Sequence, residues 1–472
     1  MDTLCKLTAR EAISKLKLGE ITPTEMIDAA EKRVLETDGK VNALPTLCFE
    51  QARNKANYFL EHPVKDPPPH YLFGLPIAVK DLVEVSGVRT TWGSPIHAEH
   101  ISTHSDYLVE RLEANGAITI AKSNTPEFGA GSHTFNEVFG HTHNPWNTDL
   151  SAGGSSGGSA TSLATGQVWL ATGSDLGGSL RNPASFCSVV GLRPSPGRVA
   201  HGPASLPFND LSVDGPMARN IADVALMLDA QVGFDPRDPL SLPAPDTSFL
   251  AAAEQPLIPK RIAFSPDLGI LPVEPEVKQI CARAAQSFSD MGITVEESCI
   301  DFTGAEEIFH VLRGQLFAAG RSNLLERREQ LKPEVIWNIE AGLAISGTDI
   351  ARATKARGAL FQRTLEFFET YDLLLCPAAV VPPFQGNLRY PTEVAGIKMD
   401  RYIDWLMICG IISLTTCPAA SIPCGFTNDN RPIGLQIVGP PRGEAAVISA
   451  GSLYEQSHPY AGMVPIDPIE ST

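Results

Sequence analysis

The chain lacks several features that would assign a protein to a class at once. No run of 18 or more apolar residues occurs in its 472 residues, and a membrane-spanning helix needs about that length. The N-terminal segment Met1–Lys6 has no basic region followed by an apolar stretch, so no secretory signal is predicted. We therefore expect a cytoplasmic protein that does not bind membranes.

Basic residues are fewer than acidic residues. The chain has 37 Lys and Arg residues against 54 Asp and Glu residues, which gives a formal net charge of −17. Binding to nucleic acid or to an anionic membrane relies on a basic surface, so neither partner is expected. The acidic excess is interpreted as a solvated surface.

Cysteine pairs and metal-binding spacings are absent or weak. The nine cysteines are an odd number and include no Cys-x-x-Cys pair, which favours reduced thiols over a disulfide framework. His141 and His143, with His97, His100, His104 and His133 nearby, invite a zinc interpretation. Solvent-facing or loop histidines explain them better, so no metal and no cofactor are predicted.

What is present is a pattern of alternating helices and short apolar strands. Thr8 and Glu11 have the spacing of a capping box, and Pro23 follows Thr22 as it does at the start of a helix. Strands are predicted in 74–85, 117–121, 167–172, 261–264, 293–297, 372–376, 419–423 and 434–438, and helices in 105–115, 276–291 and 304–369. This alternation predicts an α/β fold with a central mixed sheet flanked by helices.

Three segments carry candidate chemistry. They are 76–81 (Pro-Ile-Ala-Val-Lys-Asp), 153–158 (Gly-Gly-Ser-Ser-Gly-Gly) and 174–181 (Ser-Asp-Leu-Gly-Gly-Ser-Leu-Arg). A serine hydroxyl needs a base to become a nucleophile, and a lysine can be that base only when it is neutral, a state that burial favours. Lys80 follows three apolar residues, where a buried lysine is expected.

The order of these segments resembles the amidase signature family. Residues 139–147, 191–199 and 214–219 match further phrases of that family, and 432–439 matches again near the C-terminus, whereas 251–369 carries no motif. The resemblance implies a single layered α/β/α amidase domain over 1–472. Its signature core would span about 75–232, a variable helical pocket wall about 250–370, and the C-terminal part of the sheet about 371–440.

The resemblance also implies roles for particular residues. Ser179 would attack the substrate carbonyl, and Ser155 and Lys80 would relay its proton, with a cis peptide between Gly154 and Ser155. The N–H groups that stabilise the oxyanion would come from Leu176, Gly177, Gly178 and Ser179. Ser156, Asp175 and Arg181 would support this loop.

The expected substrate is a small neutral or aryl amide, and carbamates, urethanes and esters offer the same carbonyl. Gly129, Ala130 and Gly131, with Ser155, are expected to border the scissile bond and leave room for a bulky group. Of the apolar residues in 300–410, we expect Ile308, Phe309, Phe317, Trp337, Tyr402 and Trp405 to pack in the core more than in the pocket. The resemblance is compatible with a homodimer.

Besides a membrane-associated lipid amidase, which no apolar N-terminal or cap helix supports, three alternatives compete with this interpretation. Residues 153–157 satisfy Gly-x-Ser-x-Gly, the nucleophile elbow of α/β-hydrolases, but the preceding 144–149 look turn-like, and only His201, His310 and His458 follow as candidate bases. The amidase subunit of a glutamyl-tRNA amidotransferase is a second alternative, although Leu176 stands where that protein typically has threonine. A non-catalytic relative is the third, and it would require loss of a catalytic residue.

Overall fold

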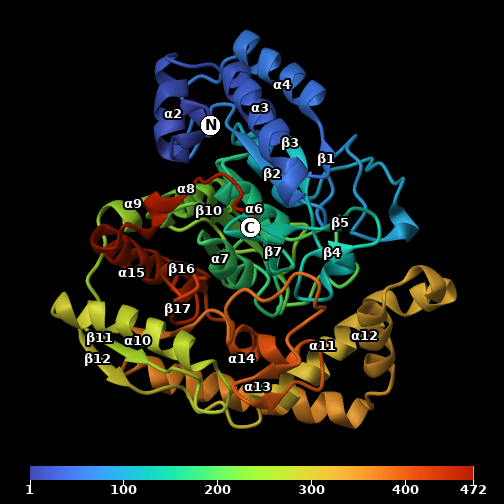
Figure 1. Cartoon of the computed structure of the whole chain (residues 1–472), viewed down its shortest axis with the longest axis vertical. Coiled ribbons are helices and arrows are strands. Elements are labelled where there is room, and N and C mark those ends of the chain that lie inside the picture. The colour runs from blue at the N-terminus through green and yellow to red at the C-terminus, as the bar shows by residue number, and fades with distance from the viewer. Residues whose placement is uncertain (471–472) are drawn as a thin grey trace.

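The fold is organised around one long mixed sheet. The computed structural model describes residues 1–470 (Figure 1). In spatial order the strands of this 11-stranded sheet are β1 (Thr46–Leu47), β3 (Ile118–Ser123), β2 (Pro76–Lys80), β8 (Leu170–Asp175), β10 (Val213–Ala218), β9 (Val190–Arg193), β16 (Ala419–Phe426), β17 (Pro432–Val438), β13 (Leu373–Pro377), β11 (Arg261–Phe264) and β12 (Thr294–Glu297).

Both pairing directions occur in the sheet. β2 runs parallel to β3 and β8, and β11 runs parallel to β12 and β13. The remaining neighbours pair antiparallel. This arrangement confirms the predicted α/β class with a central mixed sheet flanked by helices.

Three two-stranded sheets lie outside the main one: β4 (Phe135–Asn136) with β5 (Gly140–His141), β6 (His143–Asn144) with β7 (Asn147–Ser151), and β14 (Glu393–Val394) with β15 (Ile397–Lys398). The α-helices are α1 (Thr3–Lys6), α2 (Ala9–Leu18), α3 (Pro23–Val41), α4 (Phe49–Glu61), α5 (Tyr107–Ala114), α6 (Gly157–Ala164), α7 (Arg181–Cys187), α8 (Ile221–Gln231), α9 (Phe249–Glu254), α10 (Pro275–Asp290), α11 (Ala305–Arg321), α12 (Pro333–Leu343), α13 (Gly347–Phe368), α14 (Met407–Leu414) and α15 (Glu444–Ser457). Short 3-10 helices are η1 (Pro95–His97), η2 (Glu127–Gly129), η3 (Ser322–Gln330), η4 (Asp404–Leu406) and η5 (Pro459–Met463).

The helices form distinct groups around the sheet. Figure 1 shows α2, α3 and α4, drawn in blue, gathered at one end of the molecule beside β2 and β3, with α10, α13 and the β11–β12 edge at the other end. α6 and α7 pack against each other and against strands in the middle of the sheet, and α8, α9 and α15 form a second packed group. α11 packs on α12, α13 and α14, so these four helices form a helical wall.

Local sequence explains many of the element boundaries. The Thr8–Glu11 capping box is confirmed, and Thr22 forms another with Glu25 ahead of Pro23. Each box satisfies backbone N–H groups that the first helical turn leaves without partners. β2, β3 and β17 are buried at every position, which is typical of strands covered on both faces.

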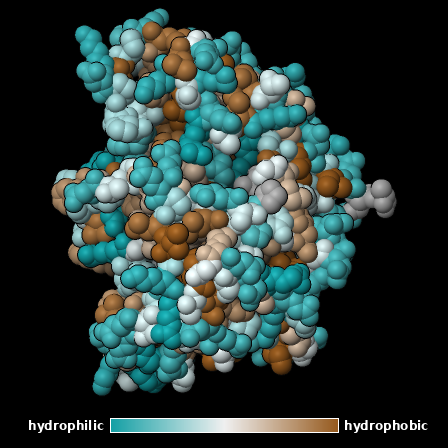
Figure 2. Space-filling model, turned by 90° about the vertical axis from the view of Figure 1, so that its left-hand side faces the viewer, coloured by the Kyte–Doolittle hydropathy of each residue, from teal (hydrophilic) through white to brown (hydrophobic). Residues whose placement is uncertain are grey.

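Hydrophilic side chains cover much of the face shown in Figure 2, and apolar side chains gather in separate patches on it. Within residues 1–470, no helix is both long and apolar enough to cross a bilayer.

Some predicted boundaries were wrong. The strand predicted in 74–85 ends at Lys80, where the chain turns and the Val83 N–H donates to the Lys80 carbonyl at 3.0 Å. The strand predicted in 167–172 is shifted to 170–175, since the Gln167 side chain bonds to Thr37 and Asp38 on α3. Residues 144–149, predicted as turn-like, lie within the β6–β7 pair, whose two strands are joined by a turn at 145–146.

We predict opposite effects on stability for two Gly→Ala substitutions in helices. A Cβ at Gly158 in α6 would lie 2.3 Å from the Asn124 nitrogen and 2.6 Å from the Ala43 oxygen, both backbone atoms. Gly158→Ala should therefore lower the free energy of unfolding by about 1–3 kcal/mol. Gly358→Ala, in α13 with nothing within 4 Å of the new Cβ, should raise it by about 0.5–1 kcal/mol. Denaturant unfolding of both variants checks this, and equal effects would contradict the packing argument.

Candidate active site

The candidate site lies where two parallel strands end. Lys80 is the last residue of β2, and Ser174 and Asp175 end the neighbouring β8. Asp214, near the start of the antiparallel β10, pairs with Ser174, so the two side chains share one face of the sheet. The carboxyl ends of parallel strands are the usual place for a ligand site in an α/β sheet.

Lys80 is buried among hydroxyl groups. Its side chain is 0% exposed, and Nζ lies 2.7 Å from Ser155 Oγ, 2.8 Å from Ser156 Oγ and 3.0 Å from Ser174 Oγ. No carboxylate in the described chain forms an ion pair with it. Burial lowers the pKa of Lys80 to about 7, although the negative charges of Asp214 and Asp175 act to raise it. The lysine can therefore be neutral near neutral pH.

The serines that contact Lys80 lie on the glycine-rich turn before α6. The predicted cis peptide between Gly154 and Ser155 is present. The side-chain amide of Asn182 contacts both ends of Gly154, accepting a hydrogen bond from its N–H at 2.8 Å and donating to its carbonyl oxygen. This contact joins the turn to α7, and sequence reasoning did not identify Asn182.

Ser179 lies on the loop between β8 and α7. It is half-buried, and it lines the same cavity as Ser155 and Ser174. The Ser156 N–H donates to the Ser179 carbonyl at 3.2 Å, which brings the two segments together. Within residues 1–470 the Ser179 hydroxyl forms no hydrogen bond, so the oxygen at the cavity wall is not engaged elsewhere.

The loop 176–179 offers fewer free N–H groups than expected. The Gly178 N–H donates to Asp175 Oδ1 at 2.8 Å, which leaves the N–H groups of Leu176, Gly177 and Ser179 without an acceptor in the described chain. Gly178 has φ +120°, and a Cβ there would lie 2.7 Å from Cys409 Cβ. Glycine is therefore needed for the shape of the loop rather than for its N–H.

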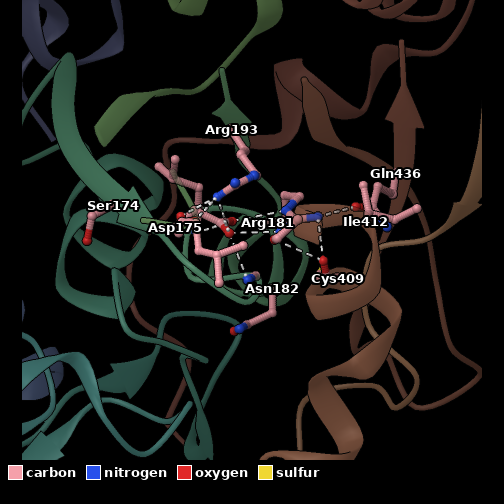
Figure 3. Close-up of polar contacts among 12 residues, drawn as sticks. Ser174, Asp175, Arg181, Asn182, Arg193, Cys409, Ile412 and Gln436 are labelled. Carbon is pink, nitrogen blue, oxygen red and sulfur yellow. Dashed lines mark hydrogen bonds and ion pairs between the residues drawn. The ribbon is translucent and has the colours of Figure 1, made fainter. Parts of the chain in front are cut away.

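A buried cluster of charges fixes this loop (Figure 3). Asp175 accepts from Arg181 Nη2 at 2.7 Å, from Arg181 Nε at 3.0 Å and from the Leu180 N–H at 3.1 Å. Arg193 Nη1 lies 3.5 Å from Asp175 Oδ1, the oxygen that also accepts from Arg181 Nη2. Burial would raise the pKa of Asp175, but the two guanidinium groups outweigh it and hold the pKa well below its usual range. Figure 3 shows the Ser174 side chain pointing away from this cluster.

Arg181 also ties the loop to the C-terminal part of the sheet. Its Nη1 donates to Gln436 Oε1 on β17 at 2.6 Å and to the Cys409 carbonyl on α14 at 3.2 Å. Its Nη2 donates to Ser413 Oγ at 2.8 Å. The segments 174–181 and 432–439, which the sequence matched separately, therefore meet at one guanidinium.

A cavity of about 350 Å³ opens beside the serines. Of the three residues expected to border the scissile bond, Gly129 and Gly131 line the cavity and Ala130 does not. A Cβ at Gly129 would lie 3.5 Å from Ser155 Oγ.

The wall from segment 300–410 differs from the prediction. Phe309, Phe317 and Tyr402 are buried, but they line this cavity instead of packing only in the core. Trp337 lines a separate cavity.

A histidine–carboxylate pair that sequence reasoning did not identify lines the cavity. His201 Nδ1 lies 2.7 Å from Asp214 Oδ2, and its side chain is 43% exposed. Burial acts to lower the pKa of His201, but the Asp214 carboxylate, with Asp106 and Asp238, raises it to about 9. His201 is therefore protonated at neutral pH, and its partner Asp214 lies opposite Ser174 in the sheet.

His133 lies in a loop, one of the two expected settings for these histidines, but it does not face solvent. This residue is fully buried, with Nδ1 2.7 Å from Ser151 Oγ and Nε2 2.9 Å from the Gly386 carbonyl, and burial lowers its pKa to about 3.

One group beside the cavity has the residue types and spacing of a metal site. The ligand atoms of Glu84, His104 and Asp106 come within 4.8 Å of one another. Glu84 is already 3.1 Å from His100 Nε2 and 3.2 Å from His104 Nε2. These contacts account for the grouping, so it carries no metal assignment.

Comparison with known proteins adds a family and a set of relatives. The family model described as Amidase matches residues 25–448. The chain is 32% identical over 467 residues to an acylamidase of Rhodococcus erythropolis, covering 98% of both chains. It is 34% identical over 481 residues to a glutamyl-tRNA(Gln) amidotransferase subunit of Moorella thermoacetica, covering 96% of this chain and 97% of that one.

Solved structures show the same fold over the full length. A bacterial aryl acylamidase belonging to the amidase signature enzymes superposes with a TM-score of 0.92 at 26% identity, over 99% of this chain and all of that one. A 6-aminohexanoate cyclic dimer hydrolase superposes with a TM-score of 0.87 at 24% identity, over 97% of this chain and 98% of that one, which is a likeness of fold.

We predict that the buried charge cluster is needed for folding. Arg181→Met leaves Asp175 with one guanidinium and removes the contacts to Gln436 and Ser413, so it should lower the free energy of unfolding by about 3–5 kcal/mol. Arg352→Met removes a surface arginine, 60% exposed, that pairs with Glu307 and Asp349, and should cost less than about 1 kcal/mol. Chemical denaturation measures both, and a small loss for Arg181→Met would show that the cluster is dispensable.

Proposed function

The chain belongs to the amidase signature family of amide-hydrolysing enzymes, and we propose that it cleaves small neutral or aryl amides through an acyl-enzyme on Ser179. The observation that carries the proposal is the buried Lys80 amine, which contacts Ser155 Oγ at 2.7 Å and has a pKa of about 7. A neutral amine at this position is a base for a serine hydroxyl.

The proton relay follows from these contacts. Ser179 Oγ attacks the substrate carbonyl carbon, its proton passes to Ser155 Oγ, and the Ser155 proton passes to Lys80 Nζ. Collapse of the tetrahedral intermediate breaks the C–N bond while the relay returns a proton to the departing amine. Water then attacks the acyl-enzyme in the same way, releasing the acid and restoring the Ser179 hydroxyl.

Stabilisation of the oxyanion is assigned to the loop after β8. The N–H groups of Leu176, Gly177 and Ser179 have no acceptor in the described chain, and Leu176, Gly177 and Ser179 line the cavity. Loss of one such donor typically costs about 10²–10³ in rate. The Asp175–Arg181 pair keeps the loop in place without taking part in the chemistry.

The substrate class is inferred from the cavity and from the relatives. The cavity volume of about 350 Å³ and the aromatic side chains of Phe309, Phe317 and Tyr402 suit a small aryl amide. Relatives named as an acylamidase and an aryl acylamidase support this class. A carbamate or ester would undergo the same carbonyl attack.

A partner-dependent role is a second candidate. Several relatives are glutamyl-tRNA(Gln) amidotransferase subunits with 31–34% identity over nearly the whole chain. Against this, Leu176 replaces the threonine typical of those proteins. A non-catalytic relative is disfavoured because Lys80, Ser155 and Ser179 are all present.

We predict that amide hydrolysis depends on Ser179. Wild-type protein should release amine from members of a panel of anilides, aliphatic amides and aryl carbamates, and Ser179→Ala should reduce kcat/KM by about 10⁴-fold or more because the nucleophile is lost. Ser322→Ala, at an exposed position, is the matched control and should leave the rate unchanged. No turnover by the wild type on any panel member would favour the partner-dependent role.

We predict that kcat/KM rises with pH through a midpoint near 7. Below the pKa of Lys80 the amine is protonated and cannot accept the Ser155 proton, whereas above it the amine is neutral and active. The profile of kcat/KM reports groups of the free enzyme, so the assay should use a substrate without ionisable groups. A rate that is flat across this range would rule out Lys80 as the base.

A further inference from the structure

Aromatic and basic side chains alternate along α11 where it faces the cavity. Phe309, Arg313, Phe317 and Arg321 follow one another at intervals of four residues, the spacing that places side chains on neighbouring turns of one helix face. All four line the cavity that also contains Ser155 and Ser179. This segment carried no recognisable motif in the sequence.

Arg313 is buried without a counter-charge. It is 7% exposed, its Nη2 donates to the Tyr402 hydroxyl at 2.6 Å, and its Nη1 donates to Asn338 Oδ1. Its guanidinium lies over the Phe317 ring, 4.5 Å from the centroid. Both polar partners are neutral, and across residues 1–470 no carboxylate forms an ion pair with this side chain.

Arg321 has fewer partners still. Its guanidinium lies 5.2 Å from the Phe317 centroid and 5.4 Å from the Phe128 centroid, and it makes neither a hydrogen bond nor an ion pair with any described residue. Burial and the nearby Arg313 lower its pKa to about 10, so it remains protonated at neutral pH. Phe317 is thus flanked by a guanidinium from each neighbouring turn of α11.

Two of the three carboxyl groups that line the same cavity contact histidines. Glu84 contacts His100 and His104, and Asp214 contacts His201. Burial raises the pKa of the remaining carboxyl, Asp106, to about 7, so it is partly protonated at neutral pH. Neither Arg313 nor Arg321 has such a carboxylate contact within residues 1–470, and an anion bound in the cavity would pair with both guanidinium groups.

We propose that Arg313 and Arg321 form a subsite for a carboxylate carried by the substrate, separated from the scissile amide by a flat spacer that packs on Phe309 and Phe317. Arginine binds carboxylates through paired N–H donors, and aromatic walls suit an aryl spacer. This inference rests on the proposed amide hydrolysis and narrows its substrate class to amides with a remote carboxylate.

The test compares matched substrates that differ only in charge. One pair carries the charge on the amine side, 4-acetamidobenzoate against 4-acetamidobenzamide. The other carries it on the acyl side, the mono-4-nitroanilide of terephthalic acid against the corresponding carboxamide. The wild type should favour the carboxylate of at least one pair by about 10- to 100-fold in kcat/KM, mainly through KM, as expected for charged hydrogen bonds.

Arg321→Met is the diagnostic variant, because Arg321 is only half-buried and makes no hydrogen bond that the fold requires. It should bring the ratio of carboxylate to carboxamide turnover close to one. Arg327→Met, an exposed arginine of η3 outside the cavity, is the matched control and should keep the wild-type ratio. A wild-type ratio near or below one in both pairs, or a preference that survives in Arg321→Met, would overturn the proposal.

Calorimetric binding to Ser179→Ala separates this proposal from the proposed chemistry. The carboxylate compounds should bind more tightly than their carboxamides, and adding Arg321→Met should remove the difference. Ser179-dependent hydrolysis without any charge preference would refute the subsite alone. Arg321-dependent binding without hydrolysis of any amide would refute the proposed chemistry and leave the subsite standing.

Discussion

The burial of the Lys80 amine among hydroxyl groups is the constraint on which the rest of the site depends. A second buried lysine, Lys122 at the end of the neighbouring β3, has a carboxylate partner, Asp81, at 3.0 Å. Lys80 has only the hydroxyls of Ser155, Ser156 and Ser174 within hydrogen-bond distance. Hydroxyl groups bond to the amine but supply no negative charge that would stabilise its protonated form. Burial therefore lowers the pKa of Lys80 to about 7.

The sheet and a second buried cluster keep that environment in place. Lys80 and Ser174 lie at the same end of the sheet because β2 and β8 run parallel. Asn182 links the turn before α6 to α7. The Asp175–Arg181 pair then fixes the loop that carries Ser179 and connects it to Gln436 on β17. A buried ion pair contributes little net stability when complete, but it is costly to break, so its main effect here is to define the position of the loop.

The cavity combines walls of different character. The motif-bearing segments supply the serines and the loop 176–179 on one side, whereas α11 supplies Phe309, Arg313, Phe317 and Arg321 on another. The chemistry proposed for the first wall is indifferent to what the amide carries. The second wall, which has aromatic rings and two guanidinium groups without an ion-pair partner in the described chain, would determine the substrate specificity.

Much of this was determined by the sequence itself, because it depends on local order. Capping patterns placed the starts of α2 and α3, apolar runs placed most strands to within a few residues, and the spacing of Lys80, Ser155 and Ser179 indicated the family. Other features depend on residues that are distant in the chain. The Gly178 N–H is taken by Asp175, His133 is buried by the segment around Gly386, and β2 stops at Lys80. Arg313 and Arg321 become candidate binding residues only because α11 packs beside a cavity that is built mainly from earlier segments. Burial and the absence of a counter-charge are properties of assembled surroundings, so only the tertiary structure could decide them.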